Sequence, residues 1–105
     1  MPTRLLAFDG GPDILVDRAL VLVGRHPRCD VRLESCRVSR IHCCLSLDCD
    51  GILVRDLAST NGTRINGMRA ETGRLRAGDE LSIAHLRFKV DGGVAECVGR
   101  AAGTQ

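Results

Sequence analysis

The spacing of glycine and proline is the feature of this sequence that most restricts its fold. The twelve glycines and three prolines fall at or between short apolar segments, so few windows remain in which a helix of ordinary length could run. The apolar segments are rich in β-branched residues or alternate apolar with polar side chains, as β-strands do. Many short strands at close spacing predict an all-β domain, either a sandwich or a barrel.

Nine segments fit this strand pattern, and a tenth would form an edge strand near the C-terminus. Alternation is clearest from Ile41 to Leu47, where Ile41 is expected to open the buried face and His42 to point the other way. Asp50-Gly51 predicts a hairpin turn, because these residues tolerate positive φ. The expected strands are residues 4–8, 14–16, 20–23, 31–33, 41–47, 52–54, 63–65, 80–83 and 86–90, with the edge strand at 94–98.

The chain of 105 residues is long enough to bury one core without a metal or disulfides. We therefore expect one domain over residues 1–98, with its motif-bearing core at 21–90, followed by a flexible tail at 99–105. No apolar run is long enough to span a membrane, and the N-terminus lacks the pattern of a secretory signal. These features predict a cytoplasmic protein, which we take to be a monomer.

The charge distribution points to a small anionic partner. The formal net charge is +2, from 15 basic and 13 acidic residues, and does not indicate a general nucleic-acid surface. Arginines nevertheless cluster between residues 25 and 40, where the only acids are Asp30 and Glu34. A solvated charged face is the alternative interpretation. The clustered arginines are at positions 25, 28, 32, 37 and 40.

Six cysteines are many for so short a chain. Without a secretory signal a disulfide framework is not expected, and adjacent Cys43 and Cys44 would point to opposite faces of a strand. No Cys-x-x-Cys pair is present, and the cysteine spacings fit no zinc-finger or zinc-ribbon pattern. We therefore expect reduced cysteines that serve as small apolar residues, with no metal site.

Three short polar signatures lie where apolar segments meet loops, so the loops could converge at one rim of the framework. The first is Gly24-Arg25, in which the strand end anchors the arginine stem and the guanidinium presents donors to a phosphate or carboxylate. A rim salt bridge from Arg25 to Asp30 or Asp56 is the alternative. The second signature is residues 39–42, in which Ser39 and Arg40 could meet the same anion.

His42 closes the second signature and is expected to hold backbone groups of a loop in place rather than to act in catalysis. The third signature is residues 59–63, where Gly62 supplies the turn and Thr60 and Asn61 present polar groups from a rigid bend. A carboxamide offers a donor and an acceptor, which suits Asn61 to the main chain of a peptide. A hairpin turn without any ligand is the alternative.

In series, these signatures resemble the forkhead-associated (FHA) domain. The resemblance rests on order, spacing and identity, and it covers about two thirds of the chain, from Val21 to Val90. It implies an eleven-strand β-sandwich of two twisted sheets whose loops at one apical end bind a phosphothreonine peptide. The matching segments are residues 24–27, 29–31, 38–42, 54–63, 65–67 and 75–81.

The resemblance also implies a role for individual residues. Arg25 and Ser39 would contact the phosphate, Arg40 and Thr60 would adjoin it, and Asn61 would bond the peptide backbone beside the phosphothreonine. The supporting residues, which would shape or assist the loops, are Gly24, His42, Gly62, Asn66 and Gly67. The natural partner would be a Ser/Thr kinase or its phosphorylated substrate, and the resemblance implies no cofactor.

The sequence departs from the family pattern in two ways. It contains no Trp or Tyr, which argues against an aromatic subsite for residues that flank the phosphothreonine. Cys36 lies just ahead of Ser39, which raises the hypothesis that oxidation of its thiol blocks binding; intact affinity after peroxide treatment would refute it.

Two other classes of function compete with this interpretation. Ser39, His42 and Asp56 are residue types of a hydrolase triad, but the first two lie three apart at a strand entry and no nucleophile-elbow sequence is present. We therefore expect no enzyme and no catalytic residue. The closer competitor is a phosphate-independent interaction or oligomerisation module on the same fold, because fold does not fix function.

Overall fold

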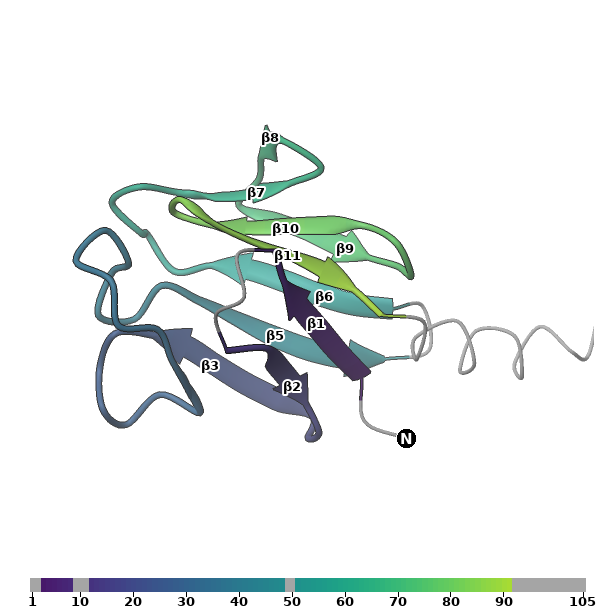
Figure 1. Ribbon diagram of the computed structural model, residues 1–105, viewed down its shortest axis with the longest axis horizontal. Coiled ribbons are helices and arrows are strands. Elements are labelled where there is room, and N and C mark those ends of the chain that lie inside the picture. The colour runs from purple at the N-terminus through teal and green to yellow at the C-terminus, as the bar shows by residue number, and fades with distance from the viewer. Residues whose placement is uncertain (1–2, 9–11, 49–50, 92–105) are drawn as a thin grey trace, which may run out of the picture.

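The computed structural model describes residues 3–8, 12–48 and 51–91, and in these ranges it contains eleven β-strands and no helix. The strands form two sheets that pack face to face, which confirms the expected all-β sandwich (Figure 1). The strands are β1 (Thr3–Ala7), β2 (Ile14–Val16), β3 (Leu20–Gly24), β4 (Val31–Arg32), β5 (Cys43–Asp48), β6 (Gly51–Asp56), β7 (Thr63–Ile65), β8 (Met68–Arg69), β9 (Thr72–Leu75), β10 (Glu80–Ile83) and β11 (Leu86–Val90).

The six-stranded sheet has the order β2-β1-β11-β10-β7-β8, and the five-stranded sheet has the order β4-β3-β5-β6-β9. Strands β3 and β4 run parallel to one another, whereas the long central strand pairs of both sheets are antiparallel. Within the described residues, no helix is long and apolar enough to span a lipid bilayer.

The core lies between the two sheets and is built from alternate residues of the strands. Leu5, Leu45 and Leu81 are fully buried, whereas their neighbours along each strand are more exposed or face the other side. Such alternation lets one face of each sheet bury its branched side chains while the other meets solvent. Thr3 and Thr63 are also buried, so the inner faces are not purely apolar.

The expectation that Ile41 opens the buried face of its strand is wrong. Strand β5 begins at Cys43, and Ile41 is 37% exposed, whereas His42 and Cys43 are both fully buried. The alternation breaks because the backbone at His42 bonds to two neighbouring segments, with its N–H donating to the Val23 carbonyl and its carbonyl accepting from the Leu57 N–H. These bonds turn the imidazole inward just before the strand begins.

Two strands, β8 and β9, were not expected from the sequence. Strand β9 lies at the edge of its sheet and buries only Leu75, so its sequence has no alternating apolar pattern. The antiparallel β5–β6 pair agrees with the hairpin expected at Asp50-Gly51; Gly51 has a positive φ of 127°, and Asp50 lies outside the described residues. The expected edge strand at 94–98 and tail at 99–105 also lie outside them.

The strand directions bring several loops to one end of the sandwich. The C-terminal end of β3, the N-terminal end of β5 and the C-terminal end of β6 lie at the same end of the five-stranded sheet, because these neighbours are antiparallel. The N-terminal end of β7 and the C-terminal end of β10 lie at the same end of the other sheet. In Figure 1 these connections lie at the left of the view. We call the segments 25–30, 33–42 and 57–62 the apical loops.

Replacing a core leucine tests this description of the core. We expect Leu45→Ala to lower the free energy of unfolding by about 2–5 kcal/mol, because it removes fully buried methyl groups and leaves a cavity. Leu20→Ala is the matched control, since Leu20 is 55% exposed and its truncation should change that free energy by less than about 0.5 kcal/mol. Urea denaturation of the two variants measures both values, and equal losses would contradict the assignment of the core.

Candidate functional site

Direct hydrogen bonds join the apical loops to one another. The N–H of Arg25 donates to the carbonyl of Ser39 at 3.0 Å, and the N–H of His26 donates to the carbonyl of Arg40 at 3.0 Å. The N–H of Thr60 donates to the hydroxyl oxygen of Ser39, also at 3.0 Å. Residues from three separate segments of the sequence therefore meet at one place on the surface.

Gly24 allows the first two loops to approach this closely. A Cβ built on Gly24 would lie 2.2 Å from the carbonyl oxygen of Arg40, well inside van der Waals contact. The Gly24 carbonyl also accepts a hydrogen bond from the N–H of Leu33 at 2.8 Å. Any larger residue would push the 33–42 loop away from Arg25, which explains the glycine at this position.

His42 ties the second and third loops together from beneath. Its imidazole is fully buried, and Nδ1 accepts a hydrogen bond from the N–H of Ser39 at 3.0 Å. Because Nδ1 accepts, the ring proton lies on Nε2, which donates to the carbonyl of Gly62 at 2.9 Å. This geometry agrees with the structural role expected for His42.

Asp56 is the anchor of the 57–62 loop, and the sequence interpretation missed it. Its carboxylate accepts hydrogen bonds from the N–H and hydroxyl of Ser59 and from the hydroxyl of Thr63. Ser59 in turn accepts from the N–H of Gly62 at 3.1 Å. Burial disfavours the carboxylate, but the bonds from Ser59 and Thr63 outweigh it and hold the pKa of Asp56 below its ordinary value. An aspartate three residues before a serine was the available signal.

Arg25 carries a guanidinium that is fixed at its base and exposed at its tip. Its Nε donates to the carbonyl of Val38 at 3.1 Å, which leaves the two terminal nitrogens directed to solvent. The alternative of a salt bridge to Asp30 or Asp56 is wrong. Asp30 accepts from Arg18 and from the N–H of Leu22, and Asp56 is engaged as described above.

The other expected contact residues surround Arg25. Among the described residues the Ser39 hydroxyl donates to no protein group, so its hydrogen remains for a ligand. The Asn61 amide nitrogen donates to the carbonyl of Arg37 at 2.6 Å, which fixes the carboxamide between two loops. Arg40 and Thr60 have exposed side chains on the same loops. The structure therefore brings together Arg25, Ser39, Arg40, Thr60 and Asn61.

Asn66 and Gly67 do not belong to this cluster. They form the β7–β8 turn, with positive φ values of 51° and 84° respectively. The Asn66 carboxamide accepts from the N–H of Glu80 at 2.9 Å and donates to Asp79 at 3.3 Å. Their contacts fix the hairpin to the start of β10 rather than to the apical loops.

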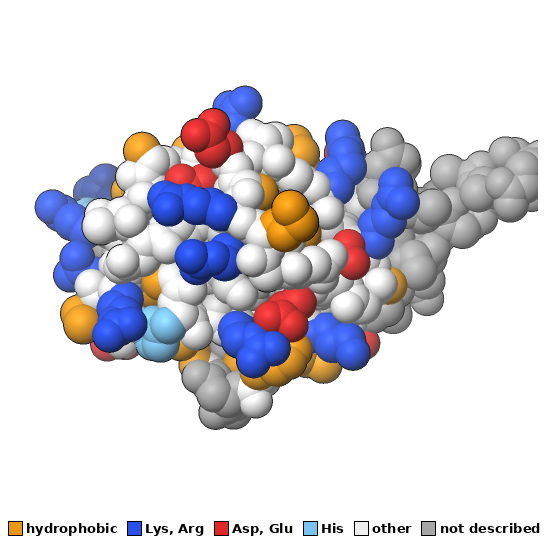
Figure 2. Space-filling model, turned by 90° about the horizontal axis from the view of Figure 1, so that it is seen from above, with side chains coloured by type: hydrophobic (Ala, Val, Ile, Leu, Met, Phe, Trp, Pro, Cys, Tyr) orange, Lys and Arg blue, Asp and Glu red, His pale blue; other side chains and the backbone are white. Residues whose placement is uncertain are grey.

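Figure 2 looks down on the molecule from the side that carries β7 and β8, with the apical end at the left. Lys and Arg side chains lie around that end, beside a histidine, and also over the rest of this face. The apical end therefore carries part of the positive charge of the domain.

Known proteins resemble this chain over the segments that carry the apical loops. A family model described as the FHA domain matches residues 21–84, which is more than half of the chain. The chain belongs to the FHA family. It is 35% identical over 90 residues to the glycogen accumulation regulator GarA of Mycobacterium tuberculosis, covering 82% of this chain and 56% of the relative. The chain thus spans a little over half the length of that relative.

Two further FHA relatives extend the comparison. The oxoglutarate dehydrogenase inhibitor of Corynebacterium glutamicum is 32% identical over 98 residues, covering 90% of this chain and 68% of that protein. A solved structure from a study of phosphothreonine-dependent FHA domain interactions superposes with a TM-score of 0.79 at 29% identity, covering 87% of this chain and 96% of the other. The eleven-strand sandwich expected from the family resemblance is therefore confirmed.

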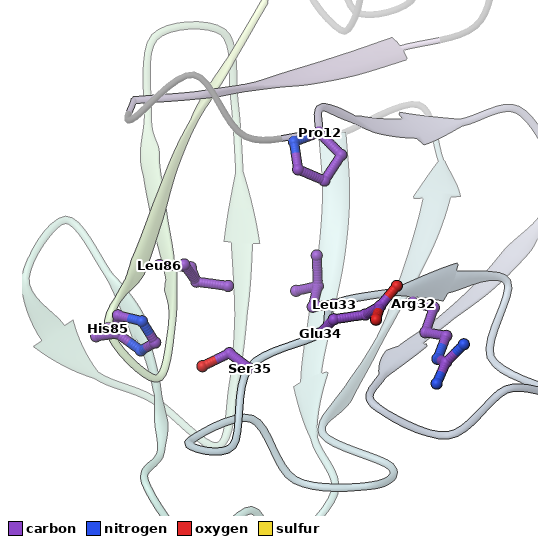
Figure 3. Close-up of a pocket in the computed structure, with 7 residues that line it drawn as sticks. All are labelled: Pro12, Arg32, Leu33, Glu34, Ser35, His85 and Leu86. Carbon is purple, nitrogen blue, oxygen red and sulfur yellow. The ribbon is translucent and has the colours of Figure 1, made fainter.

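A groove of about 440 Å³ lies beside the apical loops of this FHA domain. Figure 3 shows Leu33 and Leu86 pointing toward one another across it, with Pro12 on the third side. Ser35 and His85 add polar groups from the 33–42 loop and the β10–β11 turn. The groove offers an apolar surface with polar edges next to the site.

The cysteines that the structure describes are all free thiols. Burial raises the pKa of Cys29 and of Cys43, so both thiols stay protonated. Cys29 also donates to the carbonyl of Arg40 at 3.4 Å, which places it under the loops of the FHA site. Cys36 is exposed in the 33–42 loop, and the hypothesis that its oxidation blocks binding stays a prediction.

Replacing His42 tests whether one side chain holds two loops. We expect His42→Ala to lower the free energy of unfolding by about 2–4 kcal/mol, because the Ser39 N–H and the Gly62 carbonyl lose their partner in a buried place. His85→Ala is the matched control, since His85 is exposed and its loss should change stability by less than about 0.5 kcal/mol. Chemical denaturation that ranks the variants equally would contradict this role.

Asp56 predicts how the stability of the domain depends on pH. The lowered pKa of Asp56 in the folded state means that its stabilising contribution is present above the ordinary carboxyl value of 3.8 and is lost as pH falls through the folded value. We therefore expect wild type to be more stable than Asp56→Asn at pH 7 and this difference to narrow below about pH 4. A series of denaturation curves measures it. A difference that stays constant from pH 7 to pH 3 would refute the assignment.

Proposed function

We propose that this FHA domain binds phosphothreonine peptides at its apical loops. The observation that carries the proposal is the arrangement of Arg25, Ser39 and Asn61, which come from three loops that bond directly to one another. Each presents a group that matches part of such a peptide. The proposal treats the domain as a binding module with no catalytic residue and no cofactor.

The phosphate chemistry suits these side chains. A phosphothreonine carries about −1.5 to −2 charges at neutral pH and three acceptor oxygens. Arg25 would donate from its terminal nitrogens and Ser39 from its hydroxyl, while the exposed Arg40 and Thr60 adjoin the same place. Bonds to charged groups contribute about 1.5–3 kcal/mol each, so two such bonds make binding strongly dependent on the phosphate.

Asn61 would recognise the peptide main chain next to the phosphothreonine. Its amide nitrogen already holds the carbonyl of Arg37, and this bond orients the carboxamide before any ligand arrives. A preorganised group loses less conformational entropy on binding. The groove between Leu33 and Leu86 would then take a side chain that flanks the phosphothreonine.

Threonine rather than serine is the expected phosphorylated residue. Burying its one extra methyl group contributes about 0.8 kcal/mol, or roughly a fourfold preference in affinity. A larger preference would require an empty methyl pocket or an unfavourable rotamer in the phosphoserine complex.

The partner would be a protein phosphorylated by a Ser/Thr kinase, or the kinase itself. Two relatives carry the names of a regulator and an inhibitor, which fits a module that acts by binding another protein. We propose that the domain acts as a monomer in the cytoplasm. The proposal does not involve nucleic acid, because the 15 basic residues of the chain are offset by 13 acidic ones.

A phosphopeptide titration tests the proposal. We expect wild type to bind phosphothreonine peptides from an oriented library, and removal of the phosphate or Arg25→Ala to lower affinity by about a hundredfold or more, because charge-assisted bonds are lost. Ser39→Ala should lower it by about tenfold or more. Arg4→Ala is the charge-matched control, since Arg4 is exposed on β1, and it should leave affinity within about twofold.

Isothermal titration with each purified variant provides the measurement. Equal binding of phosphorylated and unphosphorylated peptides would instead support a phosphate-independent interaction module. Loss of binding in Arg4→Ala to the same extent as in Arg25→Ala would mean that general charge, not the apical site, determines affinity.

A further inference from the structure

The β7–β8 hairpin places two arginines directly opposite one another. Arg64 of β7 pairs with Arg69 of β8, and on its other side Arg64 pairs with Ser82 of β10. The neighbouring Ile65 packs against the core, so Arg64 points to the outer face of the sheet. Directly opposed residues of an antiparallel pair have Cβ atoms about 4.5–5.5 Å apart on the same face. The two arginine side chains therefore leave the same face of the sheet from neighbouring positions.

The described part of the chain supplies no ion pair that compensates these like charges. Like charges that lie directly opposite in a sheet destabilise it. Arg87, in the same row of residues across the sheet, forms an ion pair with Glu80 at 2.7 Å. Among residues 3–8, 12–48 and 51–91, no such ion pair is formed by Arg64 or Arg69. Their mutual repulsion is left for some other anion to relieve.

The pair lies at the edge of the apical site. A Cβ built on Gly62 would lie 3.0 Å from Nε of Arg69 and 3.1 Å from its Cζ, so the guanidinium covers Gly62. Gly62 follows Thr60 and Asn61 in the same apical loop, and these residues span at most about 7 Å along the chain. Basic side chains on this face of the molecule are visible in Figure 2. The arginine pair thus adjoins the groups that would hold a phosphothreonine.

We propose that Arg64 and Arg69 form a second anion-binding subsite that selects an acidic side chain flanking the phosphothreonine. This inference rests on the proposed function and names the sequence class of the peptide. The anion would be a carboxylate or a second phosphoryl group, since a guanidinium pairs with either. An extended peptide advances about 3.3–3.6 Å per residue, so the acidic residue lies within about four positions of the phosphothreonine.

The charge arrangement explains why an anion is the fitting occupant. A ligand anion between Arg64 and Arg69 attracts both guanidiniums and removes their repulsion, whereas an apolar or basic side chain leaves it in place. Both arginines reach solvent, so the gain from each contact is modest and falls with added salt. The subsite would thus tune the choice of peptide rather than supply most of the affinity.

A scan of acidic positions tests the subsite. In a phosphothreonine peptide whose other positions are alanine or glycine, single glutamates, and in a second arm single phosphoserines, are moved through four positions on each side. We expect one position or two adjacent ones to raise wild-type affinity about threefold to tenfold in low salt. The gain should shrink in Arg64→Gln and in Arg69→Gln and disappear in the double variant. Stronger enhancement by phosphoserine than by glutamate would identify a doubly phosphorylated ligand.

Arg4→Gln provides the matched control, because it removes one exposed positive charge from the same sheet, on β1, three strands away from β7 and four from β8. Arg4→Gln should keep the full gain in affinity that the acidic position gives to wild type. Thermal unfolding of the glutamine variants should show unchanged or slightly higher stability, since repulsion between Arg64 and Arg69 is relieved.

The outcomes separate this inference from the proposed function. If the all-alanine phosphopeptide binds through Arg25 but no acidic position raises affinity, the second subsite is refuted and the proposed function stands. A gain that persists in the double variant refutes the subsite in the same way. If no phosphothreonine peptide binds wild type, both the proposed function and the subsite are wrong.

Discussion

The apical site depends on the hydrogen bonds of one buried side chain, the imidazole of His42. It accepts from the N–H of Ser39 and donates to the carbonyl of Gly62, and both groups would otherwise be buried without partners. An unsatisfied buried group costs about 1–3 kcal/mol, which is a large part of the stability of a small domain. Moving the 33–42 loop away from the 57–62 loop would break these bonds, so the stability of the folded domain keeps the two loops in one relative position.

The loops and the hairpin above His42 carry several positive charges close together. Arg25 is fixed through its Nε and leaves its terminal nitrogens to solvent, while Arg64 and Arg69 oppose one another without an acid among the described residues. Opposed like charges such as Arg64 and Arg69 are mutually unfavourable, and a ligand anion would interact favourably with all three guanidiniums. The hydrogen bonds of the fold therefore fix the loops, and the arginines favour negatively charged ligands.

The sequence predicted most of the framework, and it predicted that three loops meet at one end, because turn residues and alternation are local signals. The prediction from sequence failed at Ile41 and at the arginine pair, where the position of a residue depends on bonds to residues far away in the sequence. Ile41 continues the apolar alternation but is displaced from the core by His42, whose backbone bonds to Val23 and Leu57. Asp56 was missed for another reason: its signal is local, and it organises a loop through Ser59 and Thr63, three and seven residues further along the chain. The opposition of Arg64 and Arg69 depends on strand register, which the two-residue strand β8 does not reveal in sequence.

The central claim is that one anion-binding surface is formed where the apical loops meet. The most direct measurement is a ¹H–¹⁵N NMR titration of the domain with a phosphothreonine peptide, including the side-chain signals of Arg25 and Asn61. The account predicts that chemical-shift changes are confined to residues 24–42, 57–69 and 85–86 and vanish when the phosphate is removed. Changes centred on the outer face of β1 and β2, or equal changes with the unphosphorylated peptide, would contradict it.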